Sequence, residues 1–316
     1  MCIRDRITGA AGFIGSNLAK KLNDIGRNDL ILVDDINHPL KKDNIDQIKH
    51  YELIGINDFL SWIKKSKNQK ISSVFHLGAC SDTLERNYKY LTQNNVVYSQ
   101  KIWQYCIEAD AEFIYASSAA TYGDGMNGFS DRHDLITNLK PLNEYGQSKQ
   151  DFDEWALSQN NAPNFWAGLK YFNVYGPGEA HKGRMASVVC HFLDQLKTSS
   201  EIKLFDSSHG VGPGEQKRDF VYIDDAIDMT LFMMNKKFKS GIYNIGSGTA
   251  STFNELAEIF LEEKLAKAIK YIPFPKDLIL NYQAYTCADM DKLRSIGYNI
   301  ESTSLASCIK SYINQK

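Results

Sequence analysis

The sequence has few of the features that mark fibrous, secreted or membrane-spanning chains. Its 316 residues include only 7 prolines and 6 cysteines. No apolar run approaches the roughly 20 residues that span a bilayer, and the start of the chain shows no basic stretch followed by an apolar one, as a signal peptide would. We therefore expect a cytoplasmic protein.

Cysteine pairs and excess charge are absent as well. The six cysteines are scattered, and none belongs to a Cys-x-x-Cys pair. This pattern favours reduced thiols over a disulfide framework or a zinc site, so we expect no metal. A formal net charge of -2 gives no electrostatic reason to expect nucleic acid or a membrane surface as a partner. Hydrophobic residues make up 43% of the chain, which is enough for a sizeable core.

The first half alternates short apolar runs with helical patterns, which predicts βαβ units. We expect an α/β fold with a Rossmann-type, doubly wound parallel sheet. The strands are expected at 30–34, 73–76, 112–116 and 165–171, and the helices at 13–25, 58–65, 93–108 and 144–157.

The sequence pattern changes after Tyr171, where glycine-rich loops replace the regular alternation of strands and helices. Residues 219–247 return to a strand–helix–strand pattern. We therefore assign residues 1–172 and 219–247 to a dinucleotide-binding domain. The remaining residues, 173–218 and 248–316, form a smaller, discontinuous C-terminal substrate lobe. Ligands of open α/β sheets bind beyond the carboxyl ends of the strands, so this lobe would cover the site.

The first expected strand is anomalous. Arg4, Asp5 and Arg6 stand where a central, apolar strand should lead into the following turn. Burying unpaired charge is costly. Our hypothesis is that residues 1–6 are foreign to the gene, which resequencing its 5′ end would test. If they are native, the strand should be frayed or shortened.

A glycine-rich turn follows, with Gly9, Gly12 and Gly15 at three-residue spacing before a helix. Such glycines allow a tight turn, a close approach to pyrophosphate and close helix packing. Asp34 and Asp35 end a strand about 20 residues later, where an acid binds the adenosine ribose. Acids favour NAD, whereas the nearby Lys41 and Lys42 favour NADP, and the residues alone leave the choice open.

Tyr145 and Lys149 form a Tyr-x-x-x-Lys motif at the start of a helix, so both side chains lie on one face. A neighbouring ammonium is expected to lower the tyrosine pKa, which suits general acid–base catalysis. Ser118, upstream at the end of a strand, is placed to hydrogen-bond the substrate hydroxyl. The order of glycine turn, serine and Tyr-x-x-x-Lys resembles the extended short-chain dehydrogenase/reductases.

Further blocks make the resemblance more specific, above all His-Lys-Gly-Arg-Met-Ala-Ser at 181–187. With residues 76–81, 171–177, 217–222, 271–275 and 282–285, they resemble the ADP-L-glycero-D-manno-heptose 6-epimerases, which act in lipopolysaccharide core assembly. The resemblance runs nearly end to end and fails at residues 1–6. It implies an isomerase that oxidises and re-reduces the heptose C6 with a bound nicotinamide cofactor, NADP or possibly NAD. It also implies a homo-oligomer.

The resemblance assigns roles by position. Tyr145 and Lys182 would handle protons on the two sides of C6, with Ser118 and Lys149 completing the catalytic set. Besides the glycine turn, Lys149 and Lys182, the expected cofactor contacts are Phe13, Ile14, Asp34, Asp35, Lys41, Leu77, Gly78, Ala79, Cys80, Ser81, Asn94 and Val174. The expected ADP-heptose contacts are Asn173, Arg184, His191, Phe205, Asp206, Ser207, Ser208, Arg218 and Tyr282.

Each of these residues also has a plainer interpretation. Lys182 alone would be a solvated lysine, Arg218 the partner of Asp219 in a surface ion pair, and His191 and Tyr282 structural side chains. As a clamp, Arg218 would bind diphosphate oxygens through both arms of its guanidinium.

The chain departs from the family at a few places. Arg184 replaces a small serine, Leu77 an acid, and Ile56 a second cofactor-side lysine, which weakens the NADP assignment. The loop at 207–214 is longer than usual.

Three other functions compete with this interpretation. A 4,6-dehydratase is disfavoured because Ala119 and Ala120 stand where that branch has an acid pair. A UDP-hexose 4-epimerase would not need Lys182, so Lys182→Ala separates the two epimerases. A non-catalytic dinucleotide-binding protein would keep the fold without the chemistry, although such proteins usually lose the tyrosine or the lysine.

Overall fold

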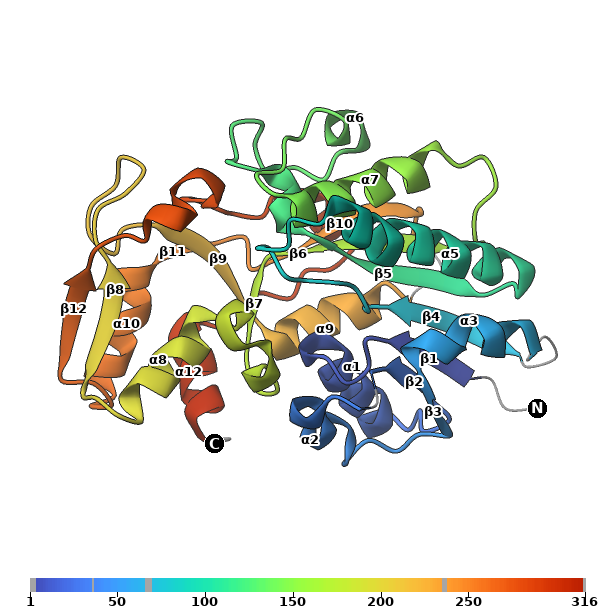
Figure 1. Ribbon diagram of the computed structural model, residues 1–316, viewed down its shortest axis with the longest axis horizontal. Helices are drawn as coiled ribbons and strands as arrows, with labels where there is room; N and C mark the ends of the chain where they lie inside the picture. Colours follow the sequence, from blue (N-terminus) through green and yellow to red (C-terminus); the bar gives the residue numbers. More distant parts are fainter. Residues whose placement is uncertain (1–3, 36, 66–69, 235–237, 315–316) are drawn as a thin grey trace.

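The computed structural model describes residues 4–35, 37–65, 70–234 and 238–314 (Figure 1). Within these ranges, the main sheet has seven strands in the order β10-β6-β5-β4-β1-β2-β3. All neighbours in it pair in parallel, which confirms the predicted doubly wound α/β fold. The strands are β1 (Arg4–Thr8), β2 (Ile31–Asp34), β3 (Glu52–Gly55), β4 (Ile71–His76), β5 (Glu112–Ser118), β6 (Trp166–Tyr171) and β10 (Gly241–Ile245).

Helices cover both faces of this sheet (Figure 1). The longer ones are α1 (Phe13–Asp24), α3 (Ile56–Lys65), α5 (Tyr98–Glu108), α7 (Glu144–Ser158) and α9 (Ile223–Phe232). Helix α1 packs against α9 on one face, whereas α5 and α7 lie on the other. Shorter pieces connect them: η1 (Pro39–Lys41), α2 (Lys42–Ile45), α4 (Tyr88–Leu91), η2 (Thr92–Val97), η3 (Ala119–Tyr122) and α6 (His133–Ile136).

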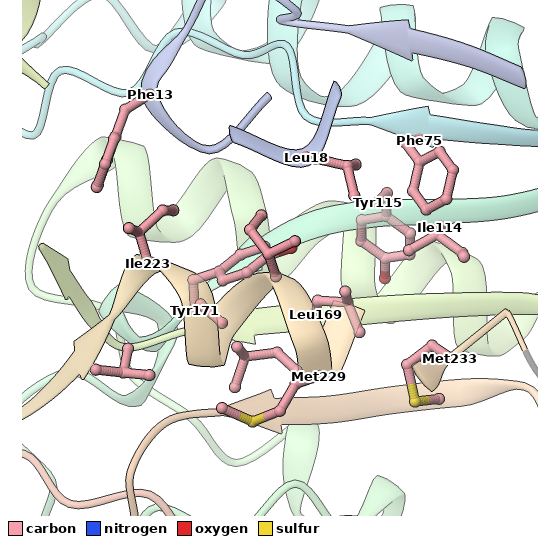
Figure 2. Packing of buried hydrophobic residues seen from close by; sticks show 14 of the residues in the cluster. Phe13, Leu18, Phe75, Ile114, Tyr115, Leu169, Tyr171, Ile223, Met229 and Met233 are labelled. Atoms are coloured by element: carbon pink, nitrogen blue, oxygen red, sulfur yellow. The ribbon is translucent and has the colours of Figure 1, made fainter. Parts of the chain in front are cut away.

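The core between the sheet and α9 is apolar and closely packed. Figure 2 shows Leu169 and Tyr171 of β6 beside Ile223, Met229 and Met233, which come from α9 and its end. All five side chains are buried. This packing fixes the direction of β6, and therefore the place where the chain leaves the sheet toward the smaller lobe.

Two short sheets lie outside the main sheet, in the part of the chain predicted to form the smaller lobe. One has the order β11-β9-β7 and the other pairs β12 with β8 in parallel. The lobe is the left part of the molecule in Figure 1. The remaining elements are β7 (Asn173–Tyr175), η4 (Ala180–Met185), α8 (Val188–Leu196), β8 (Glu201–Phe205), β9 (Lys217–Tyr222), β11 (Ala250–Thr252), α10 (Phe253–Glu262), β12 (Ala268–Ile272), η5 (Lys276–Asn281), α11 (Asp291–Ser295) and α12 (Leu305–Asn314). Of these, α11 packs against β10 of the main sheet.

Strand β9 bears on the expected domain boundary at residue 219. It begins at Lys217 and pairs with β7 and β11, so it lies outside the main sheet, whereas β10 at the end of the same segment joins it. The division into two domains stays a prediction, and the crossing at β9 shows how closely the two parts are interleaved.

The charged first strand forms despite its composition. Arg4, Asp5 and Arg6 belong to β1, which pairs with both β2 and β4, with a register shift between Arg4 and Arg6. The Asp5 carboxylate lies 2.8 Å from Arg27, and the Arg6 guanidinium lies 5.1 Å from the ring of Trp62. Residues 1–3, the rest of the suspected foreign segment, lie outside the described residues.

Candidate active site

The candidate site lies where the strand order of the main sheet reverses, between β4 and β1. The glycine turn follows β1, residues 77–81 follow β4, and Ser118 ends β5. The carboxyl ends of these parallel strands meet at one edge of the sheet, which is the edge where open α/β sheets bind ligands.

The glycine turn is packed so closely that side chains are excluded. A Cβ on Gly9, whose φ is +70°, would lie 2.6 Å from the backbone nitrogen of Gly78, and one on Gly15 would lie 2.1 Å from the Gly9 carbonyl oxygen. Helix α1 starts after Gly12 without a side-chain cap. Its first N–H groups are thus available to a pyrophosphate, and the turn fits a dinucleotide.

Asp34 connects the glycine turn to the end of β2. Its carboxylate accepts a hydrogen bond from the backbone N–H of Ala11 at 2.8 Å and lies 2.8 Å from the ammonium of Lys41. Asp34 is buried and Asp35 is exposed. The predicted ribose site therefore contains the ion pair of Asp34 with Lys41 and the exposed acid Asp35.

The structure brings Ser118, Tyr145 and Lys149 together. Asn143 caps α7 by accepting from the N–H of Gly146 at 2.8 Å, which fixes where the helix begins. The Tyr145 hydroxyl hydrogen-bonds Ser118. The Lys149 ammonium donates to the carbonyl of Ala116 at 2.8 Å. The predicted catalytic trio is therefore one contiguous group at the ends of β5 and α7.

The expected effect of Lys149 on the tyrosine is not found. Burial raises the pKa of Tyr145, and the hydrogen bond from Ser118 offsets this only in part. Burial also lowers the pKa of Lys149 to about 8, against the opposing charge of Asp153. The expectation was wrong because desolvation dominates the tyrosine pKa, and the Lys149 ammonium, directed at the Ala116 carbonyl, is not among the groups that shift it.

Lys182 lies next to the glycine turn. Its ammonium is 5.5 Å from the centre of the Phe13 ring, the first residue of α1. Burial lowers the pKa of Lys182, and the carboxylate of Glu179 opposes that shift. Asn44 links the turn to this segment, because its amide donates to the carbonyls of Ala11 at 3.0 Å and Gly178 at 3.1 Å.

Arg218 is buried, so it is no surface ion pair. Its guanidinium lies 4.6 Å from the centre of the Tyr282 ring and donates to the carbonyl of Lys217 at 2.9 Å. The carboxylate of Asp219 is engaged elsewhere, by the hydroxyl of Ser247 at 2.7 Å among others. Arg218 and Tyr282 therefore form one unit of the expected substrate side.

An aromatic cluster extends this unit. The rings of Phe205 and Tyr282 lie 5.2 Å and 4.9 Å from that of Phe274. Other expected substrate residues are more open: Asn173, Arg184, Asp206 and Ser207 are exposed, and Ser208 and His191 are half-buried. Their roles toward a substrate stay predictions.

Asn95 is a residue that the sequence analysis missed. It lies in the π-helix η2, accepts from the N–H of Cys80 at 2.9 Å, and donates to the Cys80 carbonyl at 3.0 Å and the Ser148 hydroxyl at 2.9 Å. It thus joins the loop after β4 to α7. The neighbouring Asn94, which was predicted, donates to the Tyr90 carbonyl at 2.8 Å. Because the two asparagines are adjacent and identical, the sequence alone does not show which of them makes these contacts.

Neither a membrane helix nor a metal site emerges from the described ranges. No helix in them is long and apolar enough to cross a bilayer. No three His, Cys, Asp or Glu side chains of that part of the chain are grouped to hold a metal ion.

Fold and site together define a dinucleotide-binding protein with a serine–tyrosine–lysine group at the switch point of its sheet. The chain belongs to the NAD dependent epimerase/dehydratase family, whose profile matches residues 6–246.

Relatives within the family are similar over nearly the whole chain. The ADP-L-glycero-D-manno-heptose-6-epimerase of Fusobacterium nucleatum is 43% identical, covering 97% of this chain and 96% of the relative. The crystal structure of the Helicobacter pylori enzyme of that name is 31% identical, with a TM-score of 0.83 over 99% and 96% of the two chains. MoeE5, solved with UDP-glucose and NAD, is 26% identical, with a TM-score of 0.78 over 98% and 97%. The resemblance inferred from the motifs is confirmed.

Proposed function

We propose that this protein is an isomerase that epimerises C6 of the heptose in ADP-D-glycero-D-manno-heptose to the L-glycero form. The observation that carries the proposal is the placement of the two candidate proton-transfer groups. Tyr145 belongs to α7, on one face of the sheet, whereas Lys182 lies against the start of α1, on the other. The names of the relatives at about 40% identity support the same reaction.

The two groups match what inversion of a carbinol requires. A bound nicotinamide dinucleotide supplies the acceptor and donor of the C6 hydride. One of Tyr145 and Lys182 accepts the hydroxyl proton as the ketone forms, and the other returns a proton when the opposite face is reduced. Ser118 orients the hydroxyl through its hydrogen bond with Tyr145. Arg218 and Tyr282 would hold the ADP group, as a guanidinium suits diphosphate oxygens.

NADP is our proposed cofactor, with NAD as the alternative. The ion pair between Asp34 and Lys41 at 2.8 Å offsets the charge of the acid that would repel a 2′-phosphate. Lys149, beside the tyrosine, would contact the nicotinamide ribose. The family and the NAD bound to MoeE5 support a nicotinamide cofactor of either kind.

We place the enzyme in the cytoplasm and expect a homo-oligomer. The six cysteines are scattered and include no Cys-x-x-Cys pair, a usage typical of chains in a reducing compartment. Light scattering on the purified protein tests the oligomer.

The decisive experiment is to incubate the purified protein with ADP-D-glycero-D-manno-heptose and no added cofactor, and to follow the C6 epimers by NMR. We expect interconversion to a stable mixture, which also shows that the dinucleotide is carried with the protein. Without interconversion, even with NAD and NADP supplied, the proposal fails and UDP-hexoses become the next substrates to test. A protein that folds and binds a dinucleotide but turns over none of these substrates is the non-catalytic alternative.

Lys182→Ala distinguishes the two epimerase classes. We expect a loss of about 100-fold or more in kcat on ADP-heptose, because one of two general acid–base groups is removed. Turnover that is unchanged in this variant would favour 4-epimerase chemistry instead.

A further inference from the structure

Residues 176–187, here called the Lys182 loop, are joined at both ends by one buried carboxylate. Glu179 is 0% exposed. Its side chain accepts hydrogen bonds from the N–H of Gly176 at 3.2 Å and from the N–H and hydroxyl of Ser187, both at 2.6 Å. The hydroxyl of Tyr312, on the last helix α12, lies 3.4 Å away. Glu179 therefore connects the start of the loop, its end and a distant helix.

The backbone carbonyl of Glu179 also accepts a hydrogen bond within the loop. The N–H of Lys182 donates to the carbonyl of Glu179 at 2.9 Å. Ser187, held by the Glu179 carboxylate, caps α8 by accepting from the N–H of Cys190 at 3.2 Å. Gly183 has a φ of +52°, and η4 is kinked there between the two anchored ends. The position of Lys182 thus follows from contacts that Glu179 makes on either side of it.

The surroundings of the Lys182 ammonium carry little other negative charge. Among the described residues, Glu179 and then the Cys190 thiol are the groups that oppose the effect of burial on the lysine. From the packed neighbours, η1 contributes the cation Lys41, itself paired with Asp34. The adjacent His181 has a pKa lowered by burial to about 4 and is neutral near pH 7, and Arg184 is exposed on the loop.

We propose that Glu179 is a positioning residue, which fixes the Lys182 ammonium beside the glycine turn and keeps it protonated until the reaction draws on its proton. A buried carboxylate that spans the loop holds geometry, and its charge favours the protonated form of a half-buried lysine. The link to catalysis rests on the proposed function, whereas the effect on Lys182 itself does not.

The test measures the protonation of Lys182 without using turnover. The protein is pulsed with acetic anhydride between pH 6 and 10, and acylation of Lys182 is followed by peptide mass spectrometry. The exposed Lys197, paired with Asp194 at 2.7 Å, is the internal reference in every digest. We expect Glu179→Gln to lower the labelling midpoint of Lys182 by about one pH unit, with no change at Lys197. An unchanged midpoint in a folded, cofactor-binding variant overturns the proposal.

Ser187→Ala is the matched control for geometry. It removes one of the hydrogen bonds to Glu179 and the cap of α8 but leaves the carboxylate in place. We expect this variant to keep the midpoint of Lys182 while losing activity, whereas Glu179→Gln changes both. The loss in kcat in either variant should reach about 10- to 100-fold, since a displaced proton-transfer group is used poorly. Equal midpoint shifts in both variants would mean that packing, not charge, acts on the lysine, and would overturn the proposal.

Two further outcomes are covered: a variant that does not fold, and a wild-type protein that does not epimerise the substrate. If Glu179→Gln does not fold, Glu179→Asp withdraws the charge by one methylene, and a smaller shift in the same direction is expected; no shift there counts against the proposal. If the wild-type protein does not epimerise ADP-heptose but the midpoint shift is seen, the proposed function fails and the inference about Glu179 stands.

Discussion

Asp34 and Lys41 determine what the end of β2 presents to a cofactor. The acid accepts from Ala11 of the glycine turn and is paired with the lysine, so its charge is offset on one side. Sequence reasoning identified both residues from their distance to the glycines. It left the choice between NAD and NADP open, because the sequence does not show whether the acid is paired with a cation.

Lys41→Ala should weaken NADP binding relative to NAD by about tenfold, because a 2′-phosphate loses a charge-assisted partner and meets an uncompensated acid. Fluorescence titration of the apoprotein with each dinucleotide measures this ratio. Lys42→Ala, the exposed neighbour, is the control and should leave the ratio unchanged. A constant ratio in Lys41→Ala would place the phosphate elsewhere.

The grouping of Ser118, Tyr145 and Lys149 was predictable because they stand at recognisable places in the sequence, a strand end and a Tyr-x-x-x-Lys motif, whereas their catalytic role stays a proposal. Glu179, Asn44 and Asn95 were not predictable, since a buried amide or acid has no sequence pattern of its own. Their partners are backbone groups of loops, which become neighbours only in the folded chain.

Among the elements, β1 departs most from expectation. Arg6 is fully buried there, between the ring of Trp62 at 5.1 Å and that of Tyr105 at 5.6 Å. Burial lowers its pKa. The aromatic neighbours explain how a charged strand is accommodated, which the sequence could not reveal because they come from α3 and α5. The foreign origin of residues 1–6 stays a hypothesis for resequencing.

Arg6→Met should raise the free energy of unfolding by about 1–3 kcal/mol, because a buried cation is replaced by an apolar chain of similar length. Urea denaturation followed by circular dichroism measures the change. Arg4→Met is the control. The guanidinium of Arg4 stacks 3.6 Å from the centre of the ring of Tyr51, an exposed residue, so we expect little change in the free energy of unfolding. A destabilised Arg6→Met would show that Arg6 contributes favourably where it lies.

The π-helix η2 replaces the start of a helix predicted at 93–108, and α5 begins at Tyr98. Its wider turn places Asn95 between Ser148 and the loop after β4 that contains Cys80, here called the Cys80 loop. Hydrophobic periodicity does not distinguish a π-helix from an α-helix, so the insertion was not predictable. Such insertions are frequent at functional sites, and this one supports the loop that is expected to contact the cofactor.

Asn95→Ala should lower cofactor affinity by about tenfold and the free energy of unfolding by about 1–3 kcal/mol, since three hydrogen bonds, one buried and two partly buried, lose their partner. Isothermal titration and thermal unfolding give the two values. Gln93→Ala, on the exposed side of the same π-helix, should change neither. Wild-type affinity in Asn95→Ala would mean that the Cys80 loop needs no such support.

Across the whole molecule, the class of fold was predictable and the lobe pairings were not. Alternating apolar runs and helices imply the parallel sheet. The pairs β8–β12 and β9–β11 join short, partly polar strands, and β8 and β12 are more than 60 residues apart in the chain. Nothing local in their composition indicates which strand is the partner.

His76 links the global stability to pH. It is buried, bonded to Thr8 and Ser99, and burial followed by the charge of Lys149 lowers its pKa to about 3. The unfolded chain binds a proton near pH 6.5, so between these values the unfolded state holds more protons. The free energy of unfolding should therefore fall by about 1.4 kcal/mol per pH unit below 6.5 for this group.

His76→Gln should flatten the decline between pH 6.5 and 4 by up to one proton equivalent. Asp5 and Asp131, whose pKa values burial raises to about 6, act in the opposite direction in both proteins and cancel in the comparison. Denaturation with urea at several pH values gives the slopes. Parallel slopes for variant and wild type would assign the acid sensitivity to other groups.

The attachment of the Lys182 loop bears on how relatives of this protein can be recombined. The loop is held by Asn44 of α2 from the glycine-turn side, and by Glu179 and Tyr312 toward the last helix. A chimaera joined near residue 172 takes Asn44 from one parent, and Glu179 and Tyr312 from the other. Its success should depend on whether the parents agree at these three positions, and much less on their overall identity.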